Sequence, residues 1–181
     1  MSGASLRRLI HAATASVVLL IPLASLTVLR GVVVAVAIAV LAGDLTRLRT
    51  PPFGAWIGRR IPVFRSDEAK QLSGATWLWV GYAIAVWLPE RAAAAAILVG
   101  ALADPAASLV GERFGRSDRK TLVGSGAFLL VAASLVFAVG VGWRAALLAG
   151  VLGALLERWP GRLDDNVLVA PVVALAVAVS S

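Results

Sequence analysis

Long apolar stretches constrain this chain more than any other feature of its sequence. From Leu9 to Gly43 the residues are almost continuously apolar. One helix of that length would exceed about 50 Å, whereas a bilayer hydrocarbon core is only about 30 Å thick. We therefore expect two antiparallel helices, at about 8–25 and 28–45, joined by a turn near Arg30. Because 60 % of the residues are apolar and 15 % charged, lipid is the expected solvent for most of the chain.

Five further apolar segments lie at about 72–88, 92–110, 122–141, 143–157 and 165–181. They predict an all-α fold, a polytopic transmembrane helix bundle with about seven spans, as one domain over 1–181. The one long polar segment, at about 46–71, mixes proline, glycine, aromatic and basic residues, which is typical of a loop at the membrane interface. Interfacial aromatic residues are expected at Trp77, Trp79, Tyr82 and Trp87.

The charged residues predict the orientation of the chain in the membrane. With the amino terminus in the cytoplasm, fourteen of the seventeen basic residues fall on the inner side, and only Arg30, Arg91 and Arg144 lie in outer turns. The net charge of +7 is therefore a topology signal and does not predict a nucleic-acid partner. Of the ten acidic residues only Glu90 falls in an outer turn, which predicts a polar site on the cytoplasmic face of the membrane.

Two residue types are scarce enough to exclude classes of chemistry. The chain has no cysteine, which excludes disulfides, thiolate metal sites and cysteine nucleophiles. Its single histidine, His11, excludes a multi-histidine metal cluster. Any metal must be held by carboxylates.

Asp104 is the most informative single position. It lies about 18 Å along a helix entered at residue 92, where a carboxylate costs about 2.5–3.5 kcal/mol on insertion scales. Such a residue normally faces a polar cavity, a partner or an ion. Pro105 cannot donate to the helix ladder, so we expect the helix to break there, with Asp104 capping a new half-helix that binds an anion. The alternative is that Asp104 only caps a kink.

Glycines, hydroxyls and cations, the components of a phosphate site, are concentrated over 111–125. Glycine lets backbone amides approach an oxyanion, Lys and Arg neutralise it, and Ser or Thr can donate to it or bind magnesium. The segment is not a Walker loop and is also compatible with an ordinary positive-inside loop. The predicted phosphate-binding residues are Gly111, Gly115, Arg116, Lys120, Thr121, Gly124 and Ser125.

Further carboxylates lie at the start of the last apolar segment. Asp164, Asp165 and Asn166 are adjacent, and Glu157 precedes them. One of them would suffice to cap the helix, for which Asp165 or Asn166 is expected, and the excess predicts magnesium binding. Elsewhere, Asp44 with Arg47 is either a helix-end ion pair or a site that orients a hydroxyl.

With these residues identified, the chain resembles the CTP-dependent lipid-alcohol kinases: dolichol kinase, phytol kinase and the CTP-using diacylglycerol kinase of fungi. The specific match is Asp104-Pro105-Ala106-Ala107 through Lys120-Thr121-Leu122-Val123-Gly124-Ser125, and Asp164-Asp165-Asn166 with Pro171 is a second one. Ala103 departs from the glycine that the family often has there. Weaker agreements are Arg7, Arg8 and His11, Asp44 and Arg47, Glu68 with Gly74 and Thr76, Gly111, Gly115 and Glu157.

The resemblance implies transfer of the γ-phosphate of a nucleoside triphosphate, preferably CTP, to the hydroxyl of a membrane lipid such as phytol, a polyprenol or dolichol, or diacylglycerol. Asp104, Asp164, Asp165 and Glu157 would then bind Mg²⁺, while Lys120 and Arg116 bind phosphates. Asp44 or His11 would orient or deprotonate the hydroxyl. The catalytic residues are thus expected to be Asp104, Lys120, Asp44 and His11, with Arg47, Glu68, Pro105 and Asn166 as further motif positions.

Two other functions compete with a kinase. A phosphatidate cytidylyltransferase also joins CTP to a membrane lipid, but its usual signature has His-Gly-Gly, and no histidine follows His11. A small cation-coupled transporter would use Asp104 as its ion site. Against a transporter, the carboxylates crowd the inner face and no internal repeat is visible.

Overall fold

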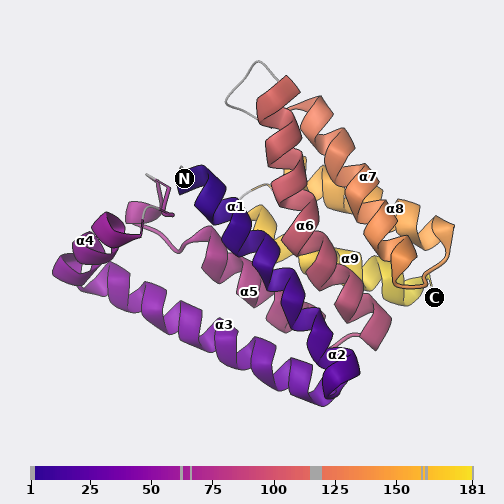
Figure 1. The fold of residues 1–181 in the computed structure, drawn as a ribbon, viewed down its shortest axis with the longest axis horizontal. Helices are drawn as coiled ribbons and strands as arrows, with labels where there is room; N and C mark the ends of the chain where they lie inside the picture. The colour runs from indigo at the N-terminus through magenta and orange to yellow at the C-terminus, as the bar shows by residue number, and fades with distance from the viewer. Residues whose placement is uncertain are drawn as a thin grey trace.

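The computed structural model describes residues 3–61, 63–65, 67–114, 120–159, 161 and 163–180, apart from the side chain of Asp67. This part of the chain is all-α, as predicted (Figure 1). Its helices in chain order are α1 (Gly3–Ala13), η1 (Thr14–Leu19), α2 (Leu20–Leu23), α3 (Leu26–Arg49), α4 (Pro51–Arg60), η2 (Asp67–Ala69), α5 (Gly74–Ala85), α6 (Glu90–Phe114), α7 (Leu122–Ala138), α8 (Trp143–Arg158) and α9 (Asp165–Val179).

The helices pack around α6 and α9. Helix α6 packs against α7 and α9, α8 packs against α7 and α9, and α5 packs against α9. Helix α3 lies at the outer edge of the molecule and packs on α5, whereas α1 crosses the bundle and packs on α6 (Figure 1). The amino-terminal helices thus cover a core formed by the carboxy-terminal two thirds of the chain.

Small residues bring the core helices close together. The buried face of α6 is mostly alanine, and Gly81 of α5 lies directly against the first turn of α9. A Cβ atom built on Gly81 would lie 2.7 Å from the backbone oxygen of Asn166. Close backbone approach of this kind is how helices in lipid gain packing energy, because water supplies no hydrophobic drive there. The position of α9, and of the polar residues at its start, depends on that approach.

Three helices, and not the seven predicted, are long and apolar enough to cross a membrane among the described residues: Gly3–Leu23, Leu26–Arg49 and Glu90–Phe114. The prediction of seven spans is therefore wrong. Every predicted apolar segment does form helix, but α5, α7, α8 and α9 have 12, 17, 16 and 15 residues. At 1.5 Å per residue these four are about 18–26 Å long, shorter than the hydrocarbon core.

The turn between the first two spans lies earlier than predicted. Ser25 caps α3 by accepting a hydrogen bond from the backbone N–H of Val28 at 3.2 Å. Arg30, expected in the turn, lies inside α3 and donates through Nε to the backbone oxygen of Val86 at 2.9 Å. A serine that satisfies a free helix N–H determines this boundary more strongly than the position of a basic residue does.

Helix α6 continues through Pro105, which corrects the predicted break. It is one helix from Glu90 to Phe114, and Pro105 is buried within it. Proline removes one hydrogen bond of the helix, yet α6 is held on several sides by α1, α5, α7 and α9. Asp104 therefore does not begin a half-helix, and the anion site predicted from such a start is absent from α6.

We predict that Gly81→Ala destabilises the protein by about 1–3 kcal/mol, because its Cβ would push α9 away from α5. Gly126→Ala on α7 is the matched control, since an added Cβ there meets nothing within 4 Å. Removing a helical glycine should make the control as stable as the wild type or more so. The measurement is thermal unfolding of the purified proteins in one detergent, and equal stability of the two variants would contradict the packing described.

Candidate functional site: an acidic cluster in an amphipathic cavity

A cavity of about 1220 Å³ collects most of the polar residues that the sequence singled out. Helices α6, α8 and α9 contribute acidic side chains to its wall, and α3 and α4 contribute Val40, Phe53 and Ile57. The wall also includes Arg7, Arg8 and His11 of α1. The cavity is therefore amphipathic: its polar part includes the acidic side chains of α6, α8 and α9, and its apolar part includes Val40 of α3 and Phe53 and Ile57 of α4.

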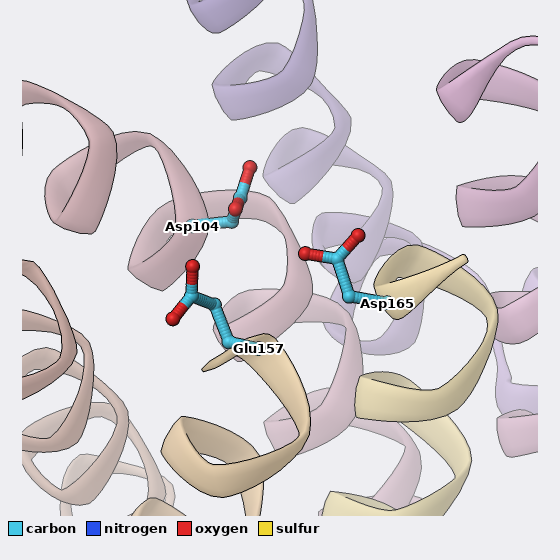
Figure 2. Close-up of side chains that lie close together, drawn as sticks. All are labelled: Asp104, Glu157 and Asp165. Carbon is cyan, nitrogen blue, oxygen red and sulfur yellow. The ribbon is translucent and has the colours of Figure 1, made fainter. Parts of the chain in front are cut away.

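Three carboxylates from three helices converge in the polar part. One oxygen each of Asp104 on α6, Glu157 on α8 and Asp165 on α9 lies within 4.8 Å of the other two. Figure 2 shows the three side chains pointing toward one another. We call them the acidic triad. Like charges this close oppose one another, so the arrangement needs a positive charge to balance it.

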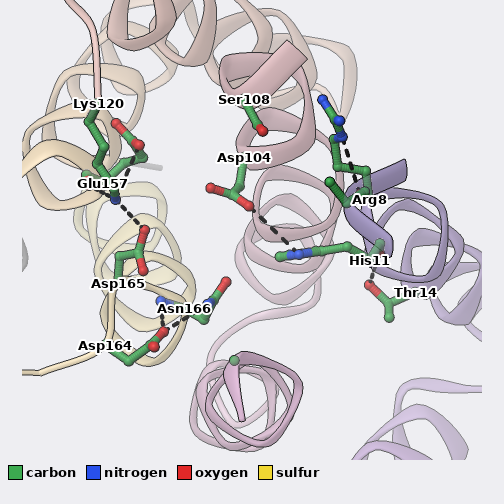
Figure 3. A network of polar contacts seen from close by, with 12 residues as sticks. Arg8, His11, Thr14, Asp104, Ser108, Lys120, Glu157, Asp164, Asp165 and Asn166 are labelled. Carbon is green, nitrogen blue, oxygen red and sulfur yellow. Dashed lines mark hydrogen bonds and ion pairs between the residues drawn. The ribbon is translucent and has the colours of Figure 1, made fainter. Parts of the chain in front are cut away.

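Lys120 supplies part of that charge. Its Nζ lies 3.1 Å from Oε1 of Glu157 and 2.5 Å from Oδ2 of Asp165, and it also donates to the backbone oxygen of Glu157 (Figure 3). Burial lowers the pKa of the Lys120 ammonium, but the carboxylates of Asp165 and Glu157 outweigh it and raise the pKa above its usual value. Lys120 is thus firmly protonated and holds α8 and α9 together at the triad.

The side chain of Glu157 shows that Lys120 does not pair with every carboxylate oxygen of the triad. Its side chain is only 7 % exposed, and its Oε2 atom has no hydrogen-bond partner among the described residues. A buried carboxylate oxygen without a donor is costly. Magnesium, calcium and manganese prefer carboxylate oxygens, so the triad is a donor set that could hold such a cation.

His11 and Arg8 connect α1 to the opposite side of Asp104. Nδ1 of His11 lies 3.7 Å from Oδ2 of Asp104, and Arg8 donates to Oε2 of Glu112 at 2.8 Å (Figure 3). Nε2 of His11 is buried and has no partner in the described part of the chain. Asp104 thus lies between the histidine on one side and the other two acids of the triad on the other side.

Tyr82 and Thr14 belong to the same region, although the sequence did not reveal their role. Tyr82 is fully buried, which corrects its predicted place among the interfacial aromatics. Its hydroxyl lies 3.1 Å from Oγ1 of Thr14 and 3.2 Å from the backbone oxygen of Ile97, and Thr14 donates to the backbone oxygen of His11 at 2.7 Å. A lone tyrosine within an apolar helix predicts a polar contact in the protein interior, because a buried phenol needs a hydrogen-bond partner.

Asp44 lies elsewhere in the cavity wall, in a buried ion pair. Oδ1 accepts from Nε of Arg47 at 2.6 Å. Oδ2 accepts from the backbone N–H of Ser73 at 2.6 Å and from the hydroxyl of Thr76 at 2.8 Å. Both carboxylate oxygens are therefore occupied, which leaves Asp44 poorly placed to accept a proton from a substrate.

Arg47 and Glu68 extend this network to the segment between α4 and α5. Arg47 donates to the backbone oxygens of Glu68 and Gln71, each at 2.8 Å. Glu68 accepts from the backbone N–H groups of Arg65 and Gly74 at 2.8 and 2.7 Å. We call Asp44, Arg47 and Glu68, with these partners, the polar clamp. It fixes the interfacial segment against α3 and the start of α5.

Asp164 and Asn166 form the amino-terminal cap of α9, which corrects the expectation that Asp165 or Asn166 caps it. Oδ1 of Asp164 accepts from the backbone N–H of Asn166 at 3.0 Å and from its side-chain amide at 2.7 Å. Burial raises the pKa of Asp164, the N–H of Asn166 opposes that shift, and the neighbouring Asp165 charge adds to it. This cap directs Asp165, not Asp164, toward the triad (Figure 3).

The predicted phosphate-binding glycines have packing roles in this structure. Thr121 caps α7 and accepts from the backbone N–H of Gly124 at 3.0 Å, so that amide is already used. A Cβ built on Gly124 would lie 2.9 Å from the backbone oxygen of Ala107, and one on Gly111 would lie 3.1 Å from Oγ1 of Thr121. Gly111, Thr121, Gly124 and Ser125 line the cavity. Gly115 and Arg116 lie outside the described residues.

No family model, curated protein or solved structure matches the chain. The side chains of the cavity and the motif resemblance are therefore the basis for a functional proposal.

We predict that Asp44→Asn destabilises the protein by about 3–5 kcal/mol, because it leaves the buried Arg47 guanidinium without a counter-charge and sets an amide against it. The control is Glu112→Gln, which removes a carboxylate that is 59 % exposed and paired with Arg8. An exposed pair contributes at most about 1 kcal/mol. Urea unfolding in detergent measures both, and an Asp44→Asn protein as stable as Glu112→Gln would contradict the clamp.

Proposed function

We propose that the protein transfers the γ-phosphate of a nucleoside triphosphate, preferably CTP, to the hydroxyl of a membrane lipid alcohol. The observation that carries this proposal is the amphipathic cavity, in which a donor set for a divalent cation and an apolar wall share one space. Phosphoryl transfer to a lipid requires that combination. The choice of a kinase and of CTP comes from the motif resemblance.

Asp104, Glu157 and Asp165 are the residues that would hold Mg²⁺. When bound, the ion would neutralise the charge of the phosphate groups during transfer. The unpartnered Oε2 of Glu157 and the mutual approach of the three carboxylates fit such an ion. Asp164 is left out of this set because its Oδ1 is engaged in the cap of α9.

Cationic side chains around the same cavity would bind the phosphates. Lys120 would turn from Asp165 toward a phosphate oxygen once another cation balances the triad. Arg7 lines the cavity and lies within electrostatic range of both Asp104 and Arg65. A triphosphate needs several such groups, since transfer depends mainly on positioning and charge neutralisation.

His11 is a better candidate than Asp44 for the group that holds the acceptor hydroxyl. Its Nε2 has no partner among the described residues, whereas both oxygens of Asp44 are taken by the polar clamp. In the proposed reaction, the hydroxyl oxygen bonds to the γ-phosphorus and the bond from that phosphorus to the β-bridging oxygen breaks. The nucleoside diphosphate leaves, and the hydroxyl proton passes through His11 to solvent.

The membrane location of the reaction follows from the three long apolar helices. We place the cavity at the cytoplasmic side, because five basic residues line it, Arg7, Arg8, Arg47, Arg65 and Lys120, whereas Arg30, Arg91 and Arg144 do not. The acceptor is then a lipid whose hydroxyl reaches the inner interface, and CTP arrives from the cytoplasm.

The purified protein, incubated with Mg²⁺, a lipid alcohol and CTP labelled in the γ-phosphate, should transfer the label to the lipid. A panel of phytol, a polyprenol, diacylglycerol and phosphatidate identifies the acceptor, and phosphatidate supplies the phosphate that a cytidylyltransferase needs. CTP labelled in the α-phosphate is the control and should leave the lipid unlabelled. Label from the α-phosphate in the lipid, with the γ-phosphate released in pyrophosphate, would contradict the kinase and establish a cytidylyltransferase.

Asp104→Asn should lower turnover by about a hundredfold or more while the protein stays folded, because it removes one charge from the triad without changing its shape. Glu112→Gln is the control, since Glu112 lies on the same helix and lines the same cavity but is not part of the triad. Initial rates and unfolding temperatures are measured for both variants. Unchanged turnover in Asp104→Asn would remove Asp104 from the site.

A further inference from the structure

Helices α1 and α3 meet at one end of the molecule and separate toward the other. They are joined through α2 and the turn at Ser25, where α3 packs on α2 and η1 (Figure 1). Beyond that end α1 packs on α6, and α3 packs on α5 and α4. Ile10 of α1 and Val40 of α3 both line the cavity.

From this arrangement we infer that the hydrocarbon chain of the lipid acceptor enters the cavity sideways between α1 and α3, past Gly43. This inference rests on the proposed function, because it assigns the position of that reaction's acceptor. We call the opening between α1 and α3 the portal. It is defined by Ile10 of α1 and by Val40 and Gly43 of α3.

The two helices beside the portal have few fully buried residues. In the most apolar 18-residue stretch of each segment, no residue of Gly3–Leu23 is buried and 17 % of the residues of Leu26–Arg49 are buried. The corresponding fraction in α6 is 61 %. Lipid would therefore cover the exposed residues of both helices. A hydrocarbon chain can pass from the bilayer along these surfaces into the cavity without crossing water.

The face of α3 toward the cavity changes from apolar to polar along its length. Val40, Gly43, Asp44 and Arg47 all line the cavity, a spacing that places them on one side of the helix. The polar clamp neutralises Asp44 and Arg47, so the cavity wall beside the portal presents no unpaired charge from these two residues. A neutral chain can lie against this face.

Apolar residues continue the path beyond the portal. Phe53 and Ile57 of α4 and Leu78 and Trp79 of α5 line the same cavity. On α1, Ile10 is directly followed by His11, whose Nδ1 is 3.7 Å from Asp104. A molecule with a long apolar chain and one polar end would thus place that end beside His11 and the acidic triad.

Gly43 leaves open space at the portal. A Cβ built on it would meet nothing within 4 Å, and the residue is exposed in the middle of a helix. A larger side chain at this position would therefore fill open space without pushing on the core. Gly31 is a matched position on the same helix, also exposed with nothing within 4 Å, but it does not line the cavity.

Gly43→Leu should lower turnover with a twenty-carbon isoprenoid alcohol about tenfold or more, by excluding its chain from the portal. Turnover with a five-carbon alcohol, which can reach the site from the water, should stay within about twofold of the wild type. Gly31→Leu should leave both rates unchanged. If Gly43→Leu and Gly31→Leu behave alike with the long alcohol, while the wild type phosphorylates it, the portal is wrong.

A binding measurement tests the portal without relying on kinase activity. The chain has no cysteine, so Gly43→Cys and Gly31→Cys each carry a single thiol for a fluorescent label. In bilayer nanodiscs, a brominated long-chain alcohol should quench the label at 43 in a saturable manner and the label at 31 only in proportion to its concentration. Saturable quenching at 43 without any lipid phosphorylation would refute the proposed function and keep the portal; identical, unsaturable quenching at both positions would overturn the portal.

Discussion

The structure depends on a concentration of like charge within a small, mostly apolar protein. Asp104, Glu157 and Asp165 come from three helices and hold their oxygens within 4.8 Å of one another. Such an arrangement forms only because alanine and glycine bring α6, α8 and α9 close, and because Lys120 balances two of the three acids. The unpartnered oxygen of Glu157 shows that this balance is incomplete in the described residues. The proposed ion would balance that remaining negative charge, and the proposed reaction depends on the ion.

The ion pair of Asp44 and Arg47 is a second group of charges in the cavity wall. Hydrogen bonds within the polar clamp occupy the charged groups of Asp44, Arg47 and Glu68. These residues therefore hold the cavity wall in place and do not attract an ion. Buried pairs of this kind are costly to break but add little net stability, which favours a positioning role over a catalytic one. In the proposed reaction the hydrocarbon chain lies against this neutral wall, and the charged phosphates lie beside the acidic triad.

The sequence predicted the positions of the helices and many of the polar residues that line the cavity, because apolar runs and excess carboxylates are local signals. Asp104 was identified by its depth in an apolar helix. Glu157 and Asp165 were identified because the start of the last apolar segment has more carboxylates than a helix cap needs. The number of spans was wrong because four of the predicted segments form helices of only 12 to 17 residues, which are shorter than the hydrocarbon core. The sequence did not reveal the partners of Asp44, Tyr82 and Gly124, because those partners, Ser73, Thr14 and Ala107, are distant in sequence. A single sequence carries no record of such long-range pairs.

The most direct test of the central claim is spin-echo spectroscopy of Mn²⁺ bound in place of Mg²⁺, in the presence of CTP. If the acidic triad holds the cation beside the triphosphate, the wild type should bind one Mn²⁺ tightly and show coupling to phosphorus nuclei. Glu157→Gln, which keeps the shape of the side chain but removes its charge, should weaken that binding about tenfold or more. A Mn²⁺ affinity and phosphorus coupling unchanged by Glu157→Gln would contradict the account.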